Sequence, residues 1–488
     1  MASDFVASGS RARVSPGMLL ARQDRITVWA LPGSYLIVLG MGFIFTFYDI
    51  FDINVSFIQT CLQIVPKCTP PVASESIGIP TLLNLVGYVI GALALTSIAD
   101  RFGRRNTMLL TLAITGLGAL YSGLSGDIIN FNISRFVTGI GIGADLAIVN
   151  TYIGEMAPSV GRARFTSLIF INSALGAFLG IWLGLLLTTP PAPFPLGLPF
   201  ASAGPHFEGI GWRLMYFIAT GLCIIGILAR TLLPESSRWL VSTGQTEKAD
   251  VIVRRMEEIA SRKQTLPEVT REVSVHQEKQ MGYGEIFSNP IYVRRMLLLL
   301  VMWLLAYVTV YTIGAGFTSV LTSLGYPPPE AGLIAAIGVF GFITCAIVAS
   351  IFGESLERKY WLPIGAAITL IGGILIALAG QATSPHDIPW GAFIGALIVF
   401  FGFNIWVPMT YAWSAENFPT RARVTGFGLV DGIGHIGGGF GLVAIAPLLP
   451  HIGPLFSFLL IAGFLIVAAI IAQFGVNTRG KQLEDVSP

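Results

Sequence analysis

The chain has 488 residues, of which 53% are hydrophobic and only 11% are charged, whereas soluble globular domains carry roughly 25% charged residues. This composition excludes an ordinary soluble protein and indicates an integral membrane protein. The formal net charge of +2 implies no basic surface for nucleic acid. The sequence contains no P-loop and has no room for a soluble enzyme domain, so neither ATP-driven transport nor catalysis is expected.

Twelve apolar stretches are long enough to cross a bilayer, because a helix needs about 20 residues to span a ~30 Å hydrocarbon core. Six precede and six follow a long polar segment. The expected spans are 34–58, 77–98, 107–126, 128–153, 165–188, 212–233, 296–321, 331–352, 361–380, 390–413, 424–448 and 454–475. The sequence therefore predicts an all-α membrane protein with twelve transmembrane helices in two pseudo-symmetric six-helix bundles.

The polar segment between the bundles contains Thr246-Glu247-Lys248 followed by apolar residues at helical spacing, which predicts short amphipathic helices. We expect these helices to pack under the pore and to couple the two bundles. The expected units are a cytoplasmic N-terminal segment at 1–33, an N-terminal bundle at 34–233, a linker with short helices at 234–290, a C-terminal bundle at 291–475 and a cytoplasmic tail at 476–488.

The positions of Lys and Arg predict the orientation, because short loops rich in these residues stay cytoplasmic. They gather at both ends of the chain and after the even-numbered spans, while the opposite side has little more than Lys67 and Arg213. We expect a multi-pass protein of the cell membrane with both termini cytoplasmic. The first 25 residues lack an apolar core and carry four Arg residues, so no cleavable signal peptide is expected.

The four cysteines fall into two classes. Cys61 and Cys68 share the first outer loop, where a disulfide is one of two open possibilities, and their spacing matches no metal site. Cys223 and Cys345 lie within apolar spans and are expected to be small packing residues. No metal and no cofactor are expected.

One motif, E-x-x-P-x-x-x-R, occurs twice. Glu155, Pro158 and Arg162 follow the fourth span, and Glu416, Pro419 and Arg423 follow the tenth, 261 residues later. Such parallel repetition in a membrane chain is typical of transporters.

Six ionisable side chains are expected deep within the predicted spans: Asp49, Asp52, Arg135, Asp145, Asp431 and His435. A charge within the bilayer costs about 2.5–3.5 kcal/mol even on the lenient insertion scale, so each needs a partner or a wetted cavity. At ~1.5 Å per residue, Asp49 and Arg135 lie at similar depths and can form an ion pair. Separation of the pair would let Asp49 bind a proton; the alternative is a static structural pair. Asp52 is expected nearer the outside, in a wetted cavity, as a supporting group.

The other three groups are less specific. Asp145 lies near the midplane and suggests a second proton site or a substrate contact. Asp431 and His435 lie four residues apart on one helical face. A His there can respond to pH near neutrality, but a polar pair lining the inner vestibule is an equal alternative, and no proton role is assigned.

Aromatic and amide side chains at mid-depth are candidates for a central cavity. An amide facing lipid would be costly, so Asn172 and Asn404 are expected to face the cavity. Aromatic residues in spans more often pack or face lipid. Trp413 is a further aromatic residue at this depth. The candidate substrate-binding residues are Asp145, Tyr48, Asn172, Trp303, Tyr307, Tyr311, Asn404 and Trp406.

Four local patterns carry a family resemblance: Asp100-Arg101-Phe102-Gly103-Arg104-Arg105, Arg135-x-x-x-Gly139-x-Gly141-x-Gly143, Pro234-Glu235-Ser236-Ser237-Arg238-Trp239-Leu240 and Asn477-Thr478-Arg479-Gly480-Lys481-Gln482-Leu483-Glu484. In order, they resemble the major facilitator superfamily in its sugar-transporter-like branch over nearly the whole chain. The resemblance implies alternating access, with Asp49 as proton acceptor and Arg135 as its partner.

The resemblance also implies a charge network between helices that closes the cytoplasmic side when the outer side is open. Carried over by motif, the gating residues are Asp100, Arg101, Arg104, Glu155, Arg162, Arg238, Glu416 and Arg423. The positive-inside rule alone explains the Arg residues of this set, but it does not require the duplicated Glu.

The chain departs from the pattern at two places. Thr96 replaces a Gly four residues before Asp100. The seventh span has no Gln or Asn, where sugar porters of this branch place a Gln pair, and this departure weakens a sugar as substrate. The first span and Asp145 also resemble proton-coupled phosphate porters. However, Tyr307 stands where those porters place an Asp, and Leu146 where they place a Tyr.

We therefore expect a secondary active transporter that moves a small polar metabolite, sugar-like or an organic or inorganic anion, by proton-coupled symport. Its expected partners are the substrate, protons and the lipid bilayer, and it is expected to be a monomer. A proton-coupled phosphate porter, a facilitated uniporter of the same fold and a non-transporting membrane sensor are the alternatives.

Overall fold

The computed structural model describes residues 15–158, 162–201, 209–269, 283–382, 384, 386–418 and 423–479. Twelve helical segments in this part of the chain are long and apolar enough to cross a membrane, which confirms the predicted number. In the first half they are α2 (Ser34–Ile64), α4 (Gly78–Phe102), α5 (Arg104–Leu124), α6 (Ile128–Met156), α7 (Arg162–Thr188) and α8 (Gly211–Arg230). In the second half they are α12 (Pro290–Gly314), α14 (Pro328–Phe352), α15 (Trp361–Ala379), α16 (Trp390–Gly402) with α17 (Val407–Glu416), α18 (Arg423–Ile445) and α19 (Leu449–Gln473).

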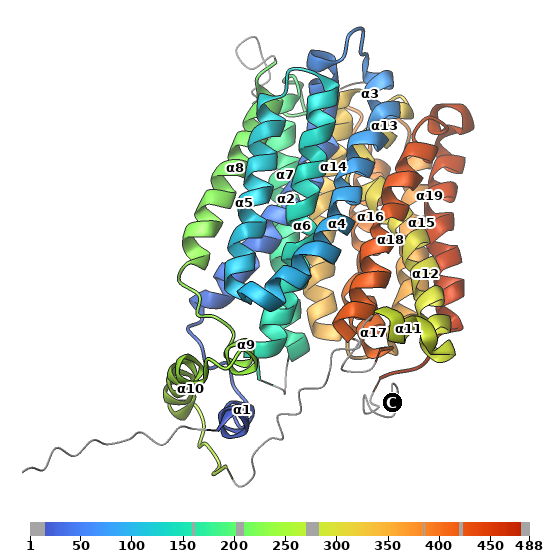
Figure 1. Ribbon diagram of the computed structural model, residues 1–488. Helices are drawn as coiled ribbons and strands as arrows, with labels where there is room; N and C mark the ends of the chain where they lie inside the picture. Colours follow the sequence, from blue (N-terminus) through green and yellow to red (C-terminus); the bar gives the residue numbers. More distant parts are fainter. Residues whose placement is uncertain are drawn as a thin grey trace, which may run out of the picture.

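The helices form two groups of six that pack side by side (Figure 1). In the first group α4 packs on α6, α2 on α7, and α5 on both α6 and α8. In the second group α12 packs on α18 and α19, while α16 lies between α14 and α15. The two groups meet along α4 with α18 and along α7 with α14. This arrangement confirms the predicted all-α fold of two bundles.

Close packing inside the first bundle depends on the glycines of α6. A Cβ atom added to Gly139 would lie 1.9 Å from the carbonyl oxygen of Asn84, and one added to Gly143 would lie 2.0 Å from that of Tyr88. Small residues let helix backbones approach in a membrane, where packing rather than hydrophobic burial drives association. Gly139 and Gly143 of the glycine pattern are therefore the contact surface for α4, while Gly141 lies against Thr115 of α5.

Two spans of the second half are interrupted. The tenth span breaks between α16 and α17, before Pro408, and the seventh gives way after Gly314 to the short helix α13 (Phe317–Ser323). Irregular backbone within a membrane is tolerated where it is buried in protein or lines a cavity. Both breaks lie beside the central cavity described below.

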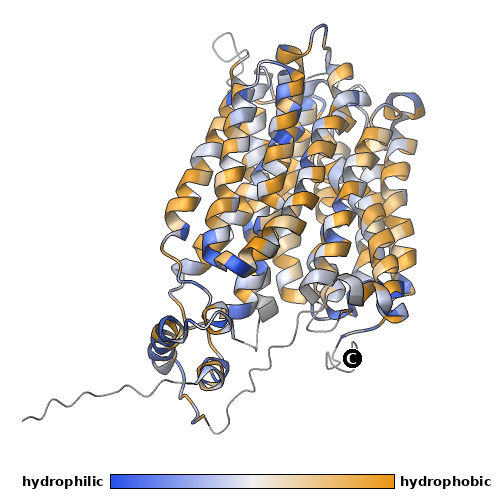
Figure 2. Cartoon of the chain, viewed as in Figure 1, coloured by the Kyte–Doolittle hydropathy of each residue, from blue (hydrophilic) through white to orange (hydrophobic). Residues whose placement is uncertain are grey.

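Short helices cover one end of the bundle, which we call the α10 end. They are α1 (Pro16–Asp24), α9 (Ser237–Ser242), α10 (Thr246–Ser261), α11 (Tyr283–Ser288) and η1 (Arg358–Tyr360). The last described residues lie at the same end, where Thr478 bonds Glu357 and Glu416. Helices α1, α9 and α10 stand out as more hydrophilic than the spans (Figures 1 and 2). The amphipathic α10 buries Ala249, Val253 and Met256.

The linker helices do not bridge the halves as expected. Helices α1, α9 and α10 pack on one another, and α9 reaches α6 of the first half, whereas α11 packs on α12 and α18 of the second. The second predicted linker piece, around 268–280, lies largely outside the described residues. Among the described residues, the polar linker is thus divided between the two halves.

The opposite, α3 end carries α3 (Pro70–Ser76) and α13. A disulfide between Cys61 and Cys68 ties the loop before α3 to the end of α2, which resolves the open question about this pair. Cys223 and Cys345 are free and buried, as expected of packing residues.

Candidate functional site

The predicted ion pair between Asp49 and Arg135 is present. Arg135 Nη1 donates to Asp49 Oδ1 at 2.8 Å and Nη2 donates to the Asp49 backbone oxygen at 2.9 Å. Each residue is only 1% exposed. The pair joins α2 to α6 in the middle of the first bundle, and Asn84 of α4 donates to the Arg135 carbonyl at 3.1 Å.

A second carboxylate, Asp52, lies one turn away on α2 and is fully buried, rather than in the wetted outer cavity expected for it. Its Oδ1 lies 3.9 Å from Arg135 Nη1. Neither of its carboxylate oxygens, nor Asp49 Oδ2, makes a hydrogen bond of ordinary geometry to the described residues. One guanidinium thus faces two buried carboxylates, which leaves an excess negative charge that one proton can neutralise.

Asp145 has a different environment from the one predicted. It forms an ion pair with Arg230, the last residue of α8: Arg230 Nη1 bonds Oδ1, and Nη2 lies 2.9 Å from Oδ2. Thr111 of α5 donates to Oδ1 at 2.8 Å. Both carboxylate oxygens are satisfied, and Asp145 is not part of the cavity wall. In this structure the carboxylate is thus fully engaged within the first bundle rather than presented to the cavity.

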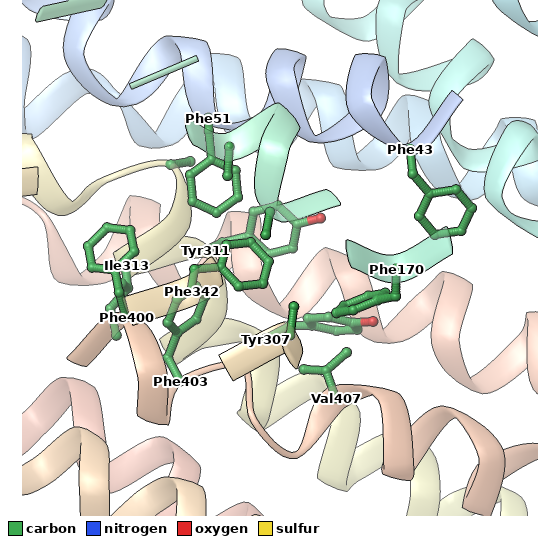
Figure 3. Close-up of a cluster of buried hydrophobic side chains, with 14 of the residues drawn as sticks. Phe43, Phe51, Phe170, Tyr307, Tyr311, Ile313, Phe342, Phe400, Phe403 and Val407 are labelled. Carbon is green, nitrogen blue, oxygen red and sulfur yellow. The ribbon is translucent and has the colours of Figure 1, made fainter. Parts of the chain in front are cut away.

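A cavity of about 40 Å³ lies between the two bundles, with room for about three water molecules. Its wall consists of Phe47, Ile50, Phe51, Leu146, Tyr307, Val310, Tyr311, Gly314, Phe342, Phe403, Asn404, Val407, Tyr411 and His435. Figure 3 shows the rings of Phe51, Tyr307, Tyr311, Phe342 and Phe403 converging from both halves. Phe342 lies 5.9 Å from Phe51 and 6.2 Å from Phe47 between ring centroids.

Of the predicted cavity residues, the structure places Tyr307, Tyr311 and Asn404 in the cavity wall. Tyr48 and the tryptophans lie behind it. Tyr48 donates to the Met215 carbonyl at 3.0 Å inside the first bundle. Trp303 donates to Ser414 at 2.9 Å and stacks on Tyr307.

The remaining candidates also pack away from the cavity. Trp406 is buried 5.4 Å from the Trp303 ring, and Trp413 donates to the Val476 carbonyl at 2.8 Å. The side-chain amide of Asn172 lies against Gly40 of α2, close enough that a Cβ there would be 2.3 Å from its Nδ2. None of these three residues forms part of the cavity wall.

Asp431 and His435 lie at the centre of the interface between the halves rather than in an inner vestibule. Tyr307 donates to Asp431 Oδ1 at 2.5 Å. Tyr88, from α4 of the first half, lies 3.5 Å from Oδ2, and the Tyr307 and Tyr411 hydroxyls are 3.1 Å apart. His435 is part of the cavity wall. Sequence reasoning missed Tyr88 and Tyr411, because only the helix arrangement brings them to this carboxylate.

The predicted gate residues form charge contacts at the α10 end. Arg104 pairs with Glu155 at 2.9 Å, and Arg238 pairs with Asp24 and donates to the Glu155 carbonyl. In the second half Arg358 lies 3.7 Å from Glu416. Among the described residues, the ion pairs of this network join segments of the same half.

The other gate predictions are less informative. Arg101 is exposed, and the side chains of Asp100, Arg162 and Arg423 lie outside the described residues. Glu235, which was not predicted as a gate residue, accepts from the backbone nitrogens of Arg104 and Arg105 at 2.9 and 3.2 Å. The sequence feature that could have identified Glu235 is its position in the Pro-Glu-Ser motif beside Arg238.

The halves are joined toward the α3 end by one fully buried amide that sequence reasoning also missed. Asn54 Nδ2 of α2 donates to the Ile313 and Gly314 carbonyls at 3.1 and 2.7 Å. Its Oδ1 accepts from the nitrogen and hydroxyl of Thr318 at 3.0 and 2.6 Å. The amide therefore makes four hydrogen bonds across the break between α12 and α13 and closes this side of the cavity.

Comparison with known proteins agrees with this architecture. The model of the family "Sugar (and other) transporter" matches residues 35–488. The chain belongs to this family. It is thus a multi-pass membrane transporter of the major facilitator superfamily rather than an enzyme.

The chain is similar to curated relatives and to solved structures of transporters. The chain is 27% identical to the niacin transporter NiaP of Acinetobacter baylyi, over 96% of this chain and 99% of the relative. It is 29% identical to the glucose transport protein of Synechocystis, over 84% and 88% of the two chains. The inward-open xylose transporter XylE from E. coli superposes with a TM-score of 0.68 at 20% identity, over 93% of this chain and 98% of that one, which shows the shared fold.

Proposed function

We propose that the chain transports a small aromatic acid by alternating access and couples this movement to protons through Asp49, Asp52 and Arg135. The observation that supports coupling is the buried charge imbalance: two carboxylates share one guanidinium. A proton on either carboxylate neutralises the group. Protonation of Asp49 weakens its attraction for Arg135 and frees α2 from α6.

The position of Asp49 links this protonation to substrate. Phe47, Ile50 and Phe51, which flank it on α2, form part of the cavity wall. A shift of α2 against α6 therefore moves one wall of the cavity. Proton binding and substrate binding then bias the same helix, which is what symport requires.

The cavity wall favours an aromatic acid over the other substrates considered. Its described wall is mostly aromatic and aliphatic, and it contains no Arg or Lys. A phosphate would leave several charges without a matching cation. A sugar would leave several hydroxyls without partners. The Tyr307 and Tyr411 hydroxyls of the wall already bond each other and Asp431, which leaves Asn404, His435 and Tyr311. One relative carries niacin in its name, and niacin is a flat heteroaromatic acid.

Sidedness follows from the basic residues. The α10 end carries Arg22, Arg104, Arg238 and Arg358, so we propose that this end is cytoplasmic. The four-bond contact of Asn54 then closes the outer side, and separation of that contact opens it. We further propose that the protein works in the cell membrane as a monomer, because each chain contains both bundles and a complete cavity.

Proteoliposomes with an imposed pH gradient test this function. Uptake of nicotinate, benzoate, glucose and phosphate is measured for the unchanged protein, for Asp49→Asn and for Glu258→Gln, which alters an exposed carboxylate on α10. We expect accumulation of the aromatic acids by the unchanged protein and by Glu258→Gln. Asp49→Asn should exchange these acids without accumulating them.

Other outcomes separate the alternatives. Accumulation of glucose or phosphate in place of the aromatic acids contradicts the proposed substrate. Equilibration without regard to the gradient, equally in all three proteins, identifies a uniporter. Absence of flux for every solute leaves a membrane sensor.

A further inference from the structure

The cavity wall contains a single basic side chain in the described part of the chain, His435 of α18. The buried carboxylate–guanidinium groups Asp49–Arg135 and Asp145–Arg230 lie outside this wall. An anionic substrate that enters the cavity therefore meets one group able to carry a compensating positive charge. The surroundings of His435 determine whether that group is available.

The imidazole has a defined orientation. Its Nδ1 lies 2.7 Å from the backbone oxygen of Asp431. A carbonyl oxygen can only accept a hydrogen bond, so Nδ1 carries the proton in this contact. No partner among the described residues occupies Nε2, at the far corner of the ring. When the imidazole is protonated, Nε2–H is thus the donor left over for a ligand.

Aromatic rings hold the imidazole in this position. The Tyr88 ring of the first half stacks on it with 4.1 Å between centroids and 19° between planes, and the Tyr307 ring lies 4.0 Å away. This stacking restricts rotation of the imidazole, so that a ligand does not have to restrict it on binding. Because Tyr88 and His435 belong to different halves, the stacked arrangement forms only when the two halves are in contact.

One charged neighbour, Asp431, favours the imidazolium form, whereas burial of the ring opposes it. Asp431 Oδ1 lies 3.7 Å from Nδ1 and is the only carboxylate among the described groups that face the ring. The other titratable groups facing it from the packed helices are hydroxyls: Tyr88 from α4, Tyr307 and Tyr311 from α12, and Tyr411 from α17 behind Tyr307. Tyr307 and Tyr88 bond Asp431 and hold it in place.

A second unused donor lies in the same wall. Asn404, in the break between α16 and α17, is only 4% exposed, and its Nδ2 has no hydrogen-bond partner among the described residues. A buried donor without a partner costs free energy unless a ligand or water fills the gap. His435 and Asn404 together offer two N–H groups, one for each oxygen of a carboxylate.

We propose that protonated His435 binds the carboxylate of the transported acid, with Asn404 as the second donor and Asp431 as the group that positions and polarises the imidazole. This inference rests on the proposed function, because it concerns how the same cavity recognises an aromatic acid. The substrate ring packs among Phe51, Phe342 and Tyr311. This carboxylate-binding site selects an ionised acid over its neutral amide, which has the same shape but no charge.

Equilibrium binding to purified protein in detergent tests this carboxylate-binding site without any proton gradient. Affinities for nicotinate and nicotinamide, and for benzoate and benzamide, are measured at pH 5.5 and pH 8. In this range the acids stay ionised, whereas an imidazole titrates. The unchanged protein should prefer acid to amide and should bind the acids about tenfold more weakly at pH 8.

His435→Gln should lower the affinity for the acids about 10- to 100-fold at pH 5.5 while changing the affinity for the amides about threefold or less, and it should remove the pH dependence. His451→Gln, an exposed histidine on α19, is the matched control and should behave as the unchanged protein does. Retention of both the acid preference and the pH dependence in His435→Gln overturns the proposal.

Asp431→Asn gives an independent test should His435→Gln fail to fold. Loss of the negative neighbour disfavours the imidazolium, so the pH midpoint of acid binding should move downward. An unchanged midpoint overturns the proposal. Failure of any aromatic acid to bind the unchanged protein instead contradicts the proposed function, so the two failures are distinguishable.

Discussion

The first bundle contains two buried Asp–Arg groups whose chemistry differs. At Asp145 and Arg230, one carboxylate meets one guanidinium through two contacts, and Thr111 adds a third hydrogen bond to the carboxylate. At Arg135, one guanidinium faces both Asp49 and Asp52. Three of the four carboxylate oxygens make no ordinary hydrogen bond to the described residues. One of these three, Asp52 Oδ1, makes only a distant ion contact with Arg135. The first group is balanced, and the second is not.

This difference indicates which group can take part in transport. A balanced buried pair gains nothing from a proton, because protonation of its carboxylate would leave an unpaired guanidinium. An unbalanced group loses an excess charge when a proton binds. We therefore assign stability to Asp145–Arg230 and proton exchange to Asp49, Asp52 and Arg135.

The largest expected effect comes from neutralising one carboxylate in each group. Asp145→Asn leaves Arg230 buried without an anion and should lower the free energy of unfolding by about 3–5 kcal/mol. Asp49→Asn leaves Arg135 with Asp52 still 3.9 Å away, so its cost should be about 1–3 kcal/mol. Equilibrium unfolding in detergent micelles measures both.

Substrate binding provides the control for this pair of variants. The folded fraction of Asp145→Asn should bind substrate with unchanged affinity, because Asp145 is not part of the cavity wall. Equal destabilisation by the two variants, or loss of binding in Asp145→Asn alone, would show that the assigned roles are wrong.

A smaller effect is expected when the contact between the halves is weakened. Asn54→Ala removes four hydrogen bonds to the break between α12 and α13 and should favour opening at the α3 end. Opening should expose the unbalanced group to reagent before the balanced one. A carbodiimide, which reacts with protonated carboxyls, should then modify Asp52 about tenfold faster, as measured by mass spectrometry of its peptide.

The rate at which the carbodiimide modifies Asp145 should not change, since Arg230 and Thr111 remain bonded to its carboxylate. Ser319→Ala, at a buried hydroxyl of α13 that has no partner among the described residues, serves as the control and should leave both labelling rates unaltered. Faster modification of Asp145 in Asn54→Ala would mean that the first bundle loosens as a whole, and would remove the contrast between the two groups.

The smallest effect is expected at an acid–base cluster outside the spans. Glu257 of α10 bonds Arg22 at 2.5 and 3.0 Å and Arg25 at 2.5 Å on the N-terminal side. Glu257→Gln should increase hydrogen exchange of α1 about two- to fivefold. Glu258→Gln, one residue along and exposed, should not change it.

The pH dependence of the same contact has a defined sign. Burial acts to raise the pKa of Glu257, but hydrogen bonds from Arg22 and Arg25 outweigh it and hold the pKa below its usual range. The docking of α1 is therefore fully stabilised above about pH 4.3, the ordinary Glu value. This stability is lost as the pH falls through the lowered pKa. A smaller protection factor for α1 at pH 7 than at pH 5, after correction for the intrinsic rise of amide exchange with pH, would contradict this assignment.

The fold and one ion pair could be predicted because they depend on length and depth. Twelve apolar stretches of sufficient length specify twelve spans, and counting along two of them brings Asp49 level with Arg135. The repeated Glu155 and Glu416 motifs likewise mark equivalent ends of the two bundles. These features need no knowledge of which helix lies beside which.

The remainder depends on helix neighbours. Arg230 is the last residue of its span and reads as a boundary charge, yet the packing of α8 against α5 and α2 brings it to Asp145. Asn54 finds four partners only because the seventh span breaks after Gly314. Tyr88 reaches Asp431 only through the contact of α4 with α18.

Substrate-driven proton movement tests whether Asp49, Asp52 and Arg135 couple transport to protons. Nicotinate is added to proteoliposomes that contain a pH-sensitive dye and no imposed gradient, and protein-free liposomes report passive permeation of the undissociated acid. We predict lumen acidification above this background with the unchanged protein and with Glu258→Gln, and background acidification with Asp49→Asn, which still exchanges labelled nicotinate. Acidification by Asp49→Asn equal to that of the unchanged protein would contradict the assignment of proton coupling to the Asp49, Asp52 and Arg135 group.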